Sequence, residues 1–236
     1  LKDRIHVDPL VVSPIDGPLR ADYEAAGIPV RIVKHPLAGG LDSASYAVGR
    51  DDFAKELLQF RAEVLFANTA ETYWALEVAS KIELPTIWNI HESEPWSDYF
   101  NDLPDYVRAD AYDAFYSAYR VAFVALSTRD LWSPLAGRHN FSVMHHGLDL
   151  TRLEKRLAGT NRLIARQQLG ISDDEVVLVV IGTVCERKNQ HILLEAIAQM
   201  EISVARRVRV FIVGDRQSPY SERLHHEWSK LAMEIR

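Results

Sequence analysis

The sequence predicts an α/β protein built from two parallel-sheet domains, both incomplete. Short apolar runs alternate with helix-length stretches along the whole chain, which is the pattern of parallel strands joined by helical crossovers. The apolar run Val176–Ile181 has no polar alternation, so we expect a strand that is covered on both faces. The chain has 236 residues, of which 47% are hydrophobic and 25% are charged, as in ordinary folded proteins.

The individual elements follow from the apolar runs and their spacing. We expect strands at residues 10–12, 30–33, 64–67, 86–90, 122–126, 142–144, 176–181 and 208–213. We expect helices at residues 19–26, 51–60, 71–81, 105–119, 161–169, 190–200 and 221–235. In the helix at 190–200, apolar residues recur at helical spacing and form one apolar face.

The distribution of charge and strand signals predicts a domain boundary near residue 150. Residues 1–150 hold 13 basic and 22 acidic side chains, whereas residues 151–236 hold 14 and 11. Such asymmetry indicates two units with different ligands, and chance drift of surface charge is the alternative. Residues 150–158 are charged and carry no strand signal, and a new strand–helix series follows them. We therefore place an N-terminal domain at 1–150 and the start of a C-terminal domain at 151–236.

Composition excludes some classes of protein. The net charge of -6 argues against a nucleic-acid partner. The single cysteine, Cys185, excludes an internal disulfide and is typical of a reducing compartment, so we expect a cytoplasmic protein. The sequence has no run of ~18 uncharged apolar residues, so we expect no membrane-spanning helix. The chain starts at Leu1 without a leader pattern, and we expect a piece of a longer protein.

Several familiar motifs are absent from the sequence. Neither G-x-G-x-x-G nor G-x-x-x-x-G-K-[ST] occurs, which disfavours nicotinamide and P-loop proteins. No H-E-x-x-H occurs, and the run His225-His226-Glu227 is expected to be a solvated helix face. We therefore expect no metal site and no cofactor.

A basic loop follows the buried strand at 176–181. The strand ends in Gly182 and Thr183, and Arg187 and Lys188 come just before the next expected helix. Cations at a helix N-terminus oppose its dipole unless an anion is bound there, and a phosphate group is the usual anion. The segment therefore predicts a phosphate site, with a solvated basic turn as the alternative.

A second polar cluster follows the expected strand at 86–90. His91 and Glu92 come directly after this strand, and ligands of open parallel sheets bind beyond the carboxyl ends of strands. A histidine there can hydrogen-bond a substrate hydroxyl or phosphate, although it could equally bond a neighbouring backbone group. The aromatic residues Trp96, Tyr99 and Phe100 either line an acceptor site or pack in the core.

The order of these motifs resembles the group 1 glycosyltransferases of family 4, whose GT-B fold has two Rossmann-like domains. Val177–Ala198 resembles the opening of the family's second domain, and Val210–Asp215 resembles its next strand. Met144–Asp149 resembles the Asn-Gly-hydrophobic-Asp segment at the hinge, and Phe123–Ser127 the strand before it. Ile87–His91 is similar to the first-domain strand that ends in an active-site histidine.

The chain departs from the family pattern at several points. Thr183 stands where the family usually has an arginine, and Arg187 is the expected replacement. His146 stands where the family has asparagine. We expect the family's first βα unit to precede Leu1 and its paired-glutamate region to follow Arg236, so that the chain alone is inactive, binds nucleotides weakly and associates through open sheet edges.

The resemblance implies a retaining glycosyltransferase that uses a nucleoside-diphosphate sugar and a glycan, lipid or small-molecule acceptor. It places the donor diphosphate at Gly182, Thr183, Arg187 and Lys188, and the catalytic His91 in the other domain. Further candidate residues of the cleft between the domains are Glu92, Gly147 and Asp149.

The resemblance also carries expectations about partners, and three alternatives stay open. Peripheral membrane contact and homo-oligomerisation are expected in addition to the sugar substrates. The alternatives are a GT-B nucleotide-sugar epimerase, a non-catalytic GT-B-like binding module and an unrelated nicotinamide enzyme.

Overall fold

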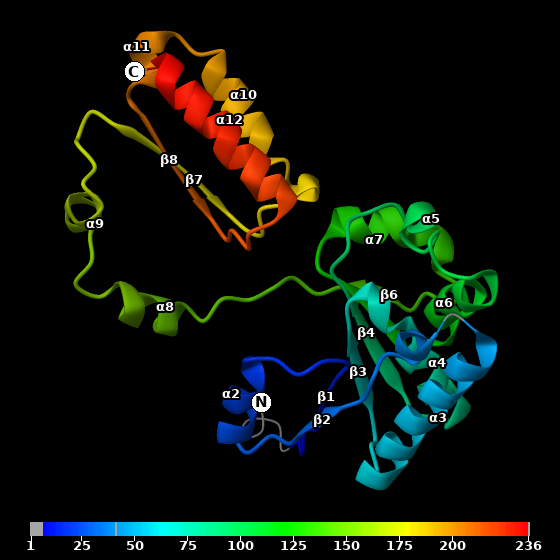
Figure 1. Ribbon diagram of the computed structural model, residues 1–236. Coiled ribbons are helices and arrows are strands. Elements are labelled where there is room, and N and C mark those ends of the chain that lie inside the picture. Colours follow the sequence, from blue (N-terminus) through cyan, green and yellow to red (C-terminus); the bar gives the residue numbers. More distant parts are fainter. Residues whose placement is uncertain (1–6, 41, 236) are drawn as a thin grey trace. The chain divides into compact units, whose positions relative to one another are not determined.

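The computed structural model describes residues 7–40 and 42–235 of the chain (Figure 1). The chain divides into two compact units, residues 1–147 and residues 148–236. Each unit has its own parallel strands and its own apolar core. In the described part of the chain, no helix combines the length and the apolar character that crossing a membrane requires.

The first unit contains two parallel sheets. β1 (Val11–Ser13) pairs with β2 (Val30–Ile32). A second sheet has the order β3-β4-β5-β6, with β3 at Leu65–Asn68, β4 at Thr86–Ile90, β5 at Arg120–Phe123 and β6 at Phe141–Val143. Because neighbouring strands of the second sheet are also consecutive in sequence, each is joined to the next by a helical crossover.

Helices join the strands of the first unit (Figure 1). They are α2 (Leu19–Ala25), α3 (Ser43–Phe60), α4 (Tyr73–Lys81), α5 (Trp96–Tyr99), α6 (Asp105–Ser117) and α7 (Leu126–Trp132). The sequence prediction of a strand reaching Leu126 is wrong, because that residue already opens α7. The helix predicted at 51–60 starts earlier, at Ser43, where the Asp42 carboxylate accepts hydrogen bonds from the backbone N–H groups of Ala44 and Ser45.

The core of the first unit lies between β3–β6 and the helices. Trp88 on β4, Phe123 on β5, Phe115 on α6 and Trp132 on α7 are fully buried there. Asn140, just before β6, is a polar member of this region with 6% exposure. Its Nδ2 donates to the carbonyls of Phe115 and Ala118 at 2.9 and 2.8 Å, which attaches β6 to the end of α6.

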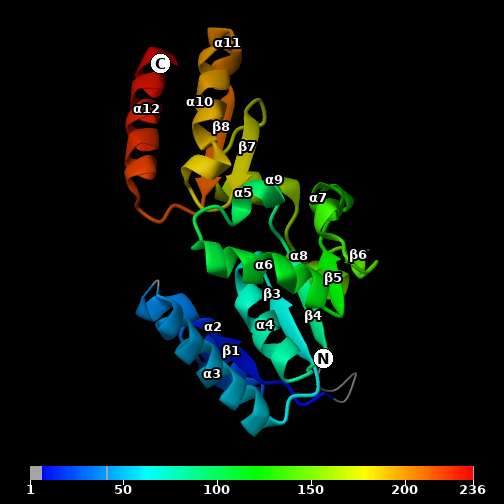
Figure 2. The same ribbon diagram turned by 90° about the vertical axis from the view of Figure 1, so that its right-hand side faces the viewer.

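The second unit holds one parallel strand pair, β7 (Val176–Ile181) with β8 (Val208–Val213). Its helices are α8 (Leu150–Leu157), α9 (Arg162–Gln168), α10 (Gln190–Ala198), α11 (Ile202–Ala205) and α12 (Pro219–Ile235). Both views place α10 and α12 on the same side of the strand pair (Figures 1 and 2). Leu194, Ile197 and Leu224 from these helices pack with Val210 and Ile212 of β8.

The expectation that β7 is covered on both faces is wrong for the described part of the chain. Val179 and Ile181 are 54% and 80% exposed, as is Val213 at 51% on β8. Side chains alternate along a strand, so these residues share the face that points away from α10 and α12. The strand pair therefore has one packed face and one open apolar face.

A network of charged side chains joins α3, α4 and α6 in the first unit. Arg50 on α3 pairs with Glu77 on α4 and, at 3.3 Å, with Asp110 on α6. Burial, reinforced by the nearby charge of Glu77, raises the pKa of Asp110 to about 6. Burial also acts to raise the pKa of Glu77, but hydrogen bonds from Lys81 and Arg50 outweigh it and leave that pKa below its ordinary value.

We predict a pH dependence of stability from Asp110. Its folded-state pKa of about 6 exceeds the ordinary value of 3.8, so the folded protein retains a proton that the unfolded chain releases between these values. Stability from this group is therefore present below pH ~4 and lost as the pH rises to ~6. Asp110→Asn lacks this proton. As the pH rises through this window, its free energy of unfolding in denaturant should therefore increase relative to that of wild type by on the order of 1 to 2 kcal/mol.

The matched control for this prediction is Asp113→Asn, which changes an exposed carboxylate on the same helix. Its free energy of unfolding relative to wild type should stay flat over the same pH range. A flat difference for Asp110→Asn as well would show that the carboxyl is ionised at the same pH in both states.

Candidate functional site

The register of β3 and β4 brings three polar residues together at the carboxyl end of the sheet. Asn68 is the last residue of β3, and its partner across the strand pair is Asn89 of β4. His91 follows Asn89 by two residues, so their side chains leave the extended chain on the same side. The three side chains therefore converge at one point of the sheet edge.

The converging groups are within hydrogen-bond distance of one another. His91 Nε2 lies 2.9 Å from Asn68 Oδ1 and 2.7 Å from Asn89 Nδ2. Asn89 Nδ2 also donates to Asn68 Oδ1 at 3.1 Å. Asn89 is only 5% exposed, whereas Asn68 is exposed and His91 is half-buried. The two amides thus hold one nitrogen of the predicted catalytic histidine.

The Glu92 side chain accepts hydrogen bonds from backbone N–H groups next to this cluster. Its Oε2 accepts the N–H of Ala70 at 2.9 Å and the N–H of His91 at 3.0 Å. The carboxylate therefore joins the end of β4 to the loop that follows β3. Thr69 in that loop has a φ of 77°, an unfavourable value for a β-branched residue. Its carbonyl accepts the Trp88 indole N–H at 2.8 Å, which helps to hold that conformation.

The two histidines that follow β6 have different partners. His146 lies against the His91 ring, with 5.0 Å between ring centroids and 32° between planes. His145 Nδ1 lies 3.1 Å from the carbonyl oxygen of Val124. In the sequence, His146 stands out only as a departure from the asparagine of the family pattern. No local signal indicates its contact with His91, 55 residues away in the chain.

The other residues predicted for the cleft have simple local environments. A Cβ on Gly147 would meet no atom within 4 Å, so this position tolerates a side chain. The Asp149 carboxylate accepts the N–H of Arg152 at 3.0 Å and caps α8. A helix cap explains this aspartate, and its proposed place in a cleft stays a prediction.

The aromatic residues after β4 pack rather than line a ligand site. Phe100 is 1% exposed and Tyr99 is half-buried. Both rings contact Trp132, with centroids 6.1 and 5.8 Å away, and Trp96 contacts Tyr112. Of the two interpretations given by the sequence, packing therefore fits this structure.

The basic loop after β7 contains a short helical turn. Arg187 and Lys188 belong to a separate one-turn 3-10 helix, Glu186–Lys188. Asn189, with a φ of 51°, separates this turn from α10, which begins at Gln190. Both cations therefore come just before the helix, as the sequence predicts, but they belong to a turn of their own that a left-handed residue separates from it. Both side chains are exposed, as is Thr183.

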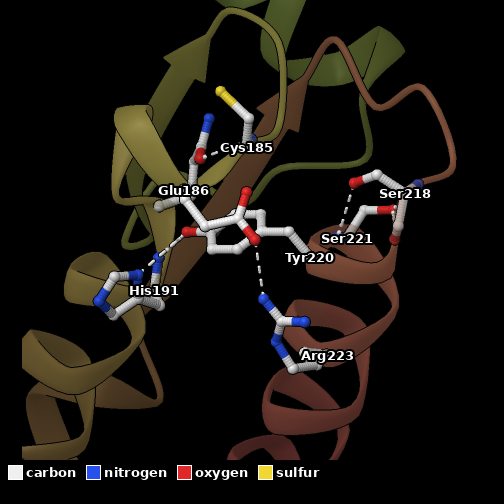
Figure 3. A network of polar contacts seen from close by, with 8 residues as sticks. Cys185, Glu186, His191, Ser218, Tyr220, Ser221 and Arg223 are labelled. Atoms are coloured by element: carbon white, nitrogen blue, oxygen red, sulfur yellow. Dashed lines mark hydrogen bonds and ion pairs between the residues drawn. The ribbon is translucent and has the colours of Figure 1, made fainter. Parts of the chain in front are cut away.

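Polar side chains fix this loop against α12 (Figure 3). Tyr220 Oη accepts the backbone N–H of His191 at 3.1 Å and lies 3.0 Å from His191 Nδ1. The Gln190 amide donates to the Thr183 carbonyl at 3.0 Å. The backbone N–H of His191, in the first turn of α10, thus already has a hydrogen-bond acceptor within the protein. Sequence reasoning missed Tyr220, because it lies 29 residues from its partner.

An ion pair compensates the acidic residue of the loop. Glu186 pairs with Arg223 of α12 at 2.9 Å (Figure 3). Its own backbone N–H, and then Arg223, hold the pKa of Glu186 below its ordinary value. The negative charge next to Arg187 and Lys188 is therefore balanced from α12, and the loop presents net positive charge.

The absence of a side chain at Gly214 allows the loops after β7 and β8 to touch. Gly214 has a φ of 114°, and a Cβ there would lie 2.4 Å from the carbonyl oxygen of Gly182. Val184 N–H donates to the Gly214 carbonyl at 3.3 Å, and Gly182 N–H to the Val213 carbonyl at 2.9 Å. This close approach positions Thr183 at the carboxyl end of the strand pair.

The described residues contain no group of three or more histidine, cysteine, aspartate or glutamate side chains arranged to hold a metal ion. The residue pair His225 and Asp215 is a two-membered contact with 3.0 Å between Nε2 and Oδ2.

Neither a protein-family model nor a curated protein matches the sequence. Solved structures match its fold. WaaG, described as a glycosyltransferase involved in lipopolysaccharide biosynthesis, matches with a TM-score of 0.63 and 14% identity, over 96% of this chain and 59% of that one. A UDP-forming trehalose-phosphate synthase from Burkholderia xenovorans matches with a TM-score of 0.63 and 10% identity, over 97% and 69%.

The apo structure of OtsA matches with a TM-score of 0.61 and 14% identity, over 84% of this chain. The chain spans about half of OtsA, at 51% of its length. These matches confirm the predicted α/β class, with parallel-sheet Rossmann-like units of the GT-B type. At such identities the likeness is one of fold.

We predict that Gly214→Ala destabilises the second unit. The added methyl would meet the Gly182 carbonyl, and the residue would keep an unfavourable φ, so a loss of about 2 kcal/mol or more is expected. Hydrogen exchange at the Val184 amide should accelerate, since its acceptor is displaced. Gly147→Ala is the matched control, because its Cβ has open space and should leave the free energy of unfolding unchanged. Equal stability of both variants would contradict the observed close approach.

Proposed function

We propose that this chain belongs to a retaining glycosyltransferase related to group 1, family 4, which transfers a hexosyl group from a nucleoside-diphosphate sugar. One observation carries the proposal. Polar and basic residues occupy the carboxyl ends of parallel strands. His91 follows β4 and meets one asparagine of β3 and one of β4, and Arg187 and Lys188 follow β7. Open α/β sheets bind ligands at these ends. The GT-B fold of the solved glycosyltransferases supports the same function.

In the proposed mechanism the second unit stabilises the leaving diphosphate. Negative charge grows on the diphosphate as the bond to the sugar breaks, and fixed cations stabilise that charge without reorganisation. We assign this role to Arg187 and Lys188, together with the backbone at Gly182 and Thr183. The ion pair of Glu186 with Arg223 places a compensating positive charge beside the acidic residue of this loop. The proposal requires neither a metal ion nor an organic cofactor.

The first unit would orient the transferred sugar. We assign His91 to a hydrogen bond with the sugar or its phosphate, and keep Gly147 and Asp149 as residues of the proposed cleft. Glu92 acts through the backbone, because its carboxylate already binds two N–H groups. Glu92 is therefore proposed to shape the loop next to His91.

The remaining features of the proposal concern partners and place. The acceptor is a glycan, a lipid or a small molecule bound mainly by the first unit. We propose a cytoplasmic protein of carbohydrate biosynthesis, with peripheral membrane contact if the acceptor is a lipid. In the second unit, β8 pairs only with β7 among the described residues, and such an open edge favours association of copies.

We predict that Lys188→Ala slows sugar transfer about a hundredfold in the protein that carries this chain. Removing one charge that stabilises a transition state commonly raises the barrier by ~3 kcal/mol. Arg187→Ala should have a similar effect if it replaces the arginine of the family pattern. The measurement is turnover of UDP-glucose, chosen because a matched trehalose-phosphate synthase is UDP-forming, with a panel of sugar and lipid acceptors.

Lys155→Ala is the matched control, because it removes an exposed lysine of α8 outside the proposed site. Its turnover should equal that of wild type. Activity of Lys188→Ala within about twofold of wild type would exclude Lys188 from the mechanism. Donor conversion without any acceptor would indicate an epimerase instead, and absence of donor binding in the wild-type protein would indicate a binding module of another kind.

A further inference from the structure

The two nitrogens of the His91 ring have different environments. Nε2 lies 2.9 Å from Asn68 Oδ1 and 2.7 Å from Asn89 Nδ2. Nδ1 has no hydrogen-bond partner among residues 7–40 and 42–235. A histidine whose one nitrogen is held by the protein presents the other nitrogen to a ligand. Nε2 is therefore held by the protein, whereas Nδ1 can accept or donate a hydrogen bond to a ligand.

We propose that His91 contacts its ligand through Nδ1, and that Asn68 and Asn89 are positioning residues that hold Nε2. The proposal rests on the proposed glycosyltransferase function. The ligand atom is an oxygen of the nucleotide sugar, either a sugar hydroxyl or a phosphate oxygen. Both are bound by a ring nitrogen in the same way, as a donor or an acceptor of one hydrogen bond.

The surroundings of the ring support a fixed orientation. Asn89 is 5% exposed and lies on a central strand, so its amide cannot move without disturbing β4. His146 covers the ring with 5.0 Å between centroids. The Glu92 carboxylate accepts the backbone N–H of His91 itself. The ring is therefore held at its backbone, at its face and at Nε2.

The choice of two asparagines has a chemical consequence. Each amide carries a donor and an acceptor at the same distance from the backbone, so the pair can hold Nε2 whether or not it bears the proton. The proton state of Nε2 in turn fixes that of Nδ1 in the neutral ring. A substitution at Asn68 or Asn89 should therefore change whether Nδ1 donates or accepts the hydrogen bond to the ligand, although neither asparagine contacts the ligand.

The first test compares two substitutions of His91. An asparagine side chain carries its amide at about the position of Nδ1, whereas a glutamine side chain reaches the position of Nε2. In calorimetric titration with UDP-glucose of the protein that carries this chain, His91→Asn should stay within about threefold of wild-type affinity, and His91→Gln should lose about tenfold, the loss of one hydrogen bond. The reverse order would overturn the proposal. Parallel titrations with UDP alone separate a phosphate oxygen, where the same order persists, from a sugar hydroxyl, where the variants become equal.

The second test reads the ring directly. Two-bond proton–nitrogen NMR spectra of the histidine rings report which nitrogen carries the proton. Asn68→Ala should change the His91 pattern and weaken UDP-glucose binding, and it should leave folding intact because Asn68 is exposed. Asn68→Asp should restore a single pattern with the proton on Nε2, because a carboxylate only accepts. Asn101→Ala, at another exposed asparagine, is the matched control and should change neither property.

The outcomes separate this proposal from the proposed function. An unchanged His91 pattern in Asn68→Ala, with UDP-glucose still bound by the wild-type protein, overturns the positioning role alone. Absence of UDP-glucose binding in the wild-type protein overturns the proposed function, and with it the role of Nδ1, whatever the NMR spectra show.

Discussion

The Glu92 carboxylate holds together the backbone on which the candidate site depends. It accepts one N–H from the loop after β3 and one from the end of β4, so both strand ends are fixed relative to each other. Asn68 and His91 stand next to these two anchored points, and their short separation is a consequence of that attachment. The unfavourable φ of Thr69 is tolerated in the same place, because its carbonyl and its N–H are both bonded to β4 residues. A carboxylate that the sequence indicates as a candidate for the cleft thus binds two backbone N–H groups of its own unit.

In the second unit, backbone contacts fix the loops at the carboxyl ends of the strands. The loops after β7 and β8 touch where Gly214 meets the Gly182 carbonyl, and a side chain at Gly214 would not fit. Tyr220 and Arg223 then fix the basic loop from α12, one through a helix amide and one through Glu186. Arg187 and Lys188 consequently project from a loop that is braced on two sides. Fixed cations of this kind stabilise a growing negative charge better than mobile ones, since they need no rearrangement.

The sequence was sufficient for the strands and for the fold class, and insufficient for contacts across long separations. The eight strands were found because buried parallel strands are apolar runs, and their ends moved by only a few residues. His91 could be placed at a strand end for the same reason. Its partners Asn68 and His146 could not, because only the register of β3 with β4 and the course of the chain after β6 bring them near. The basic loop precedes α10 as the sequence predicts, but nothing in the sequence marks Asn189 as left-handed. The open face of β7 was missed because an apolar run does not reveal how many layers cover it.

The burial of Asn140 has a consequence for chemical modification. The run Asn140-Phe141-Ser142 has the form of an acceptor for N-linked glycans. In the folded protein both hydrogens of its amide nitrogen are engaged by carbonyls of α6 and its C-terminal end, and the side chain is 6% exposed. A glycan could be attached only before β6 joins the sheet, and it would then keep that strand from docking. Folding of the first unit therefore makes Asn140 inaccessible to modification. A chain glycosylated at this position would be unable to complete the fold of that unit.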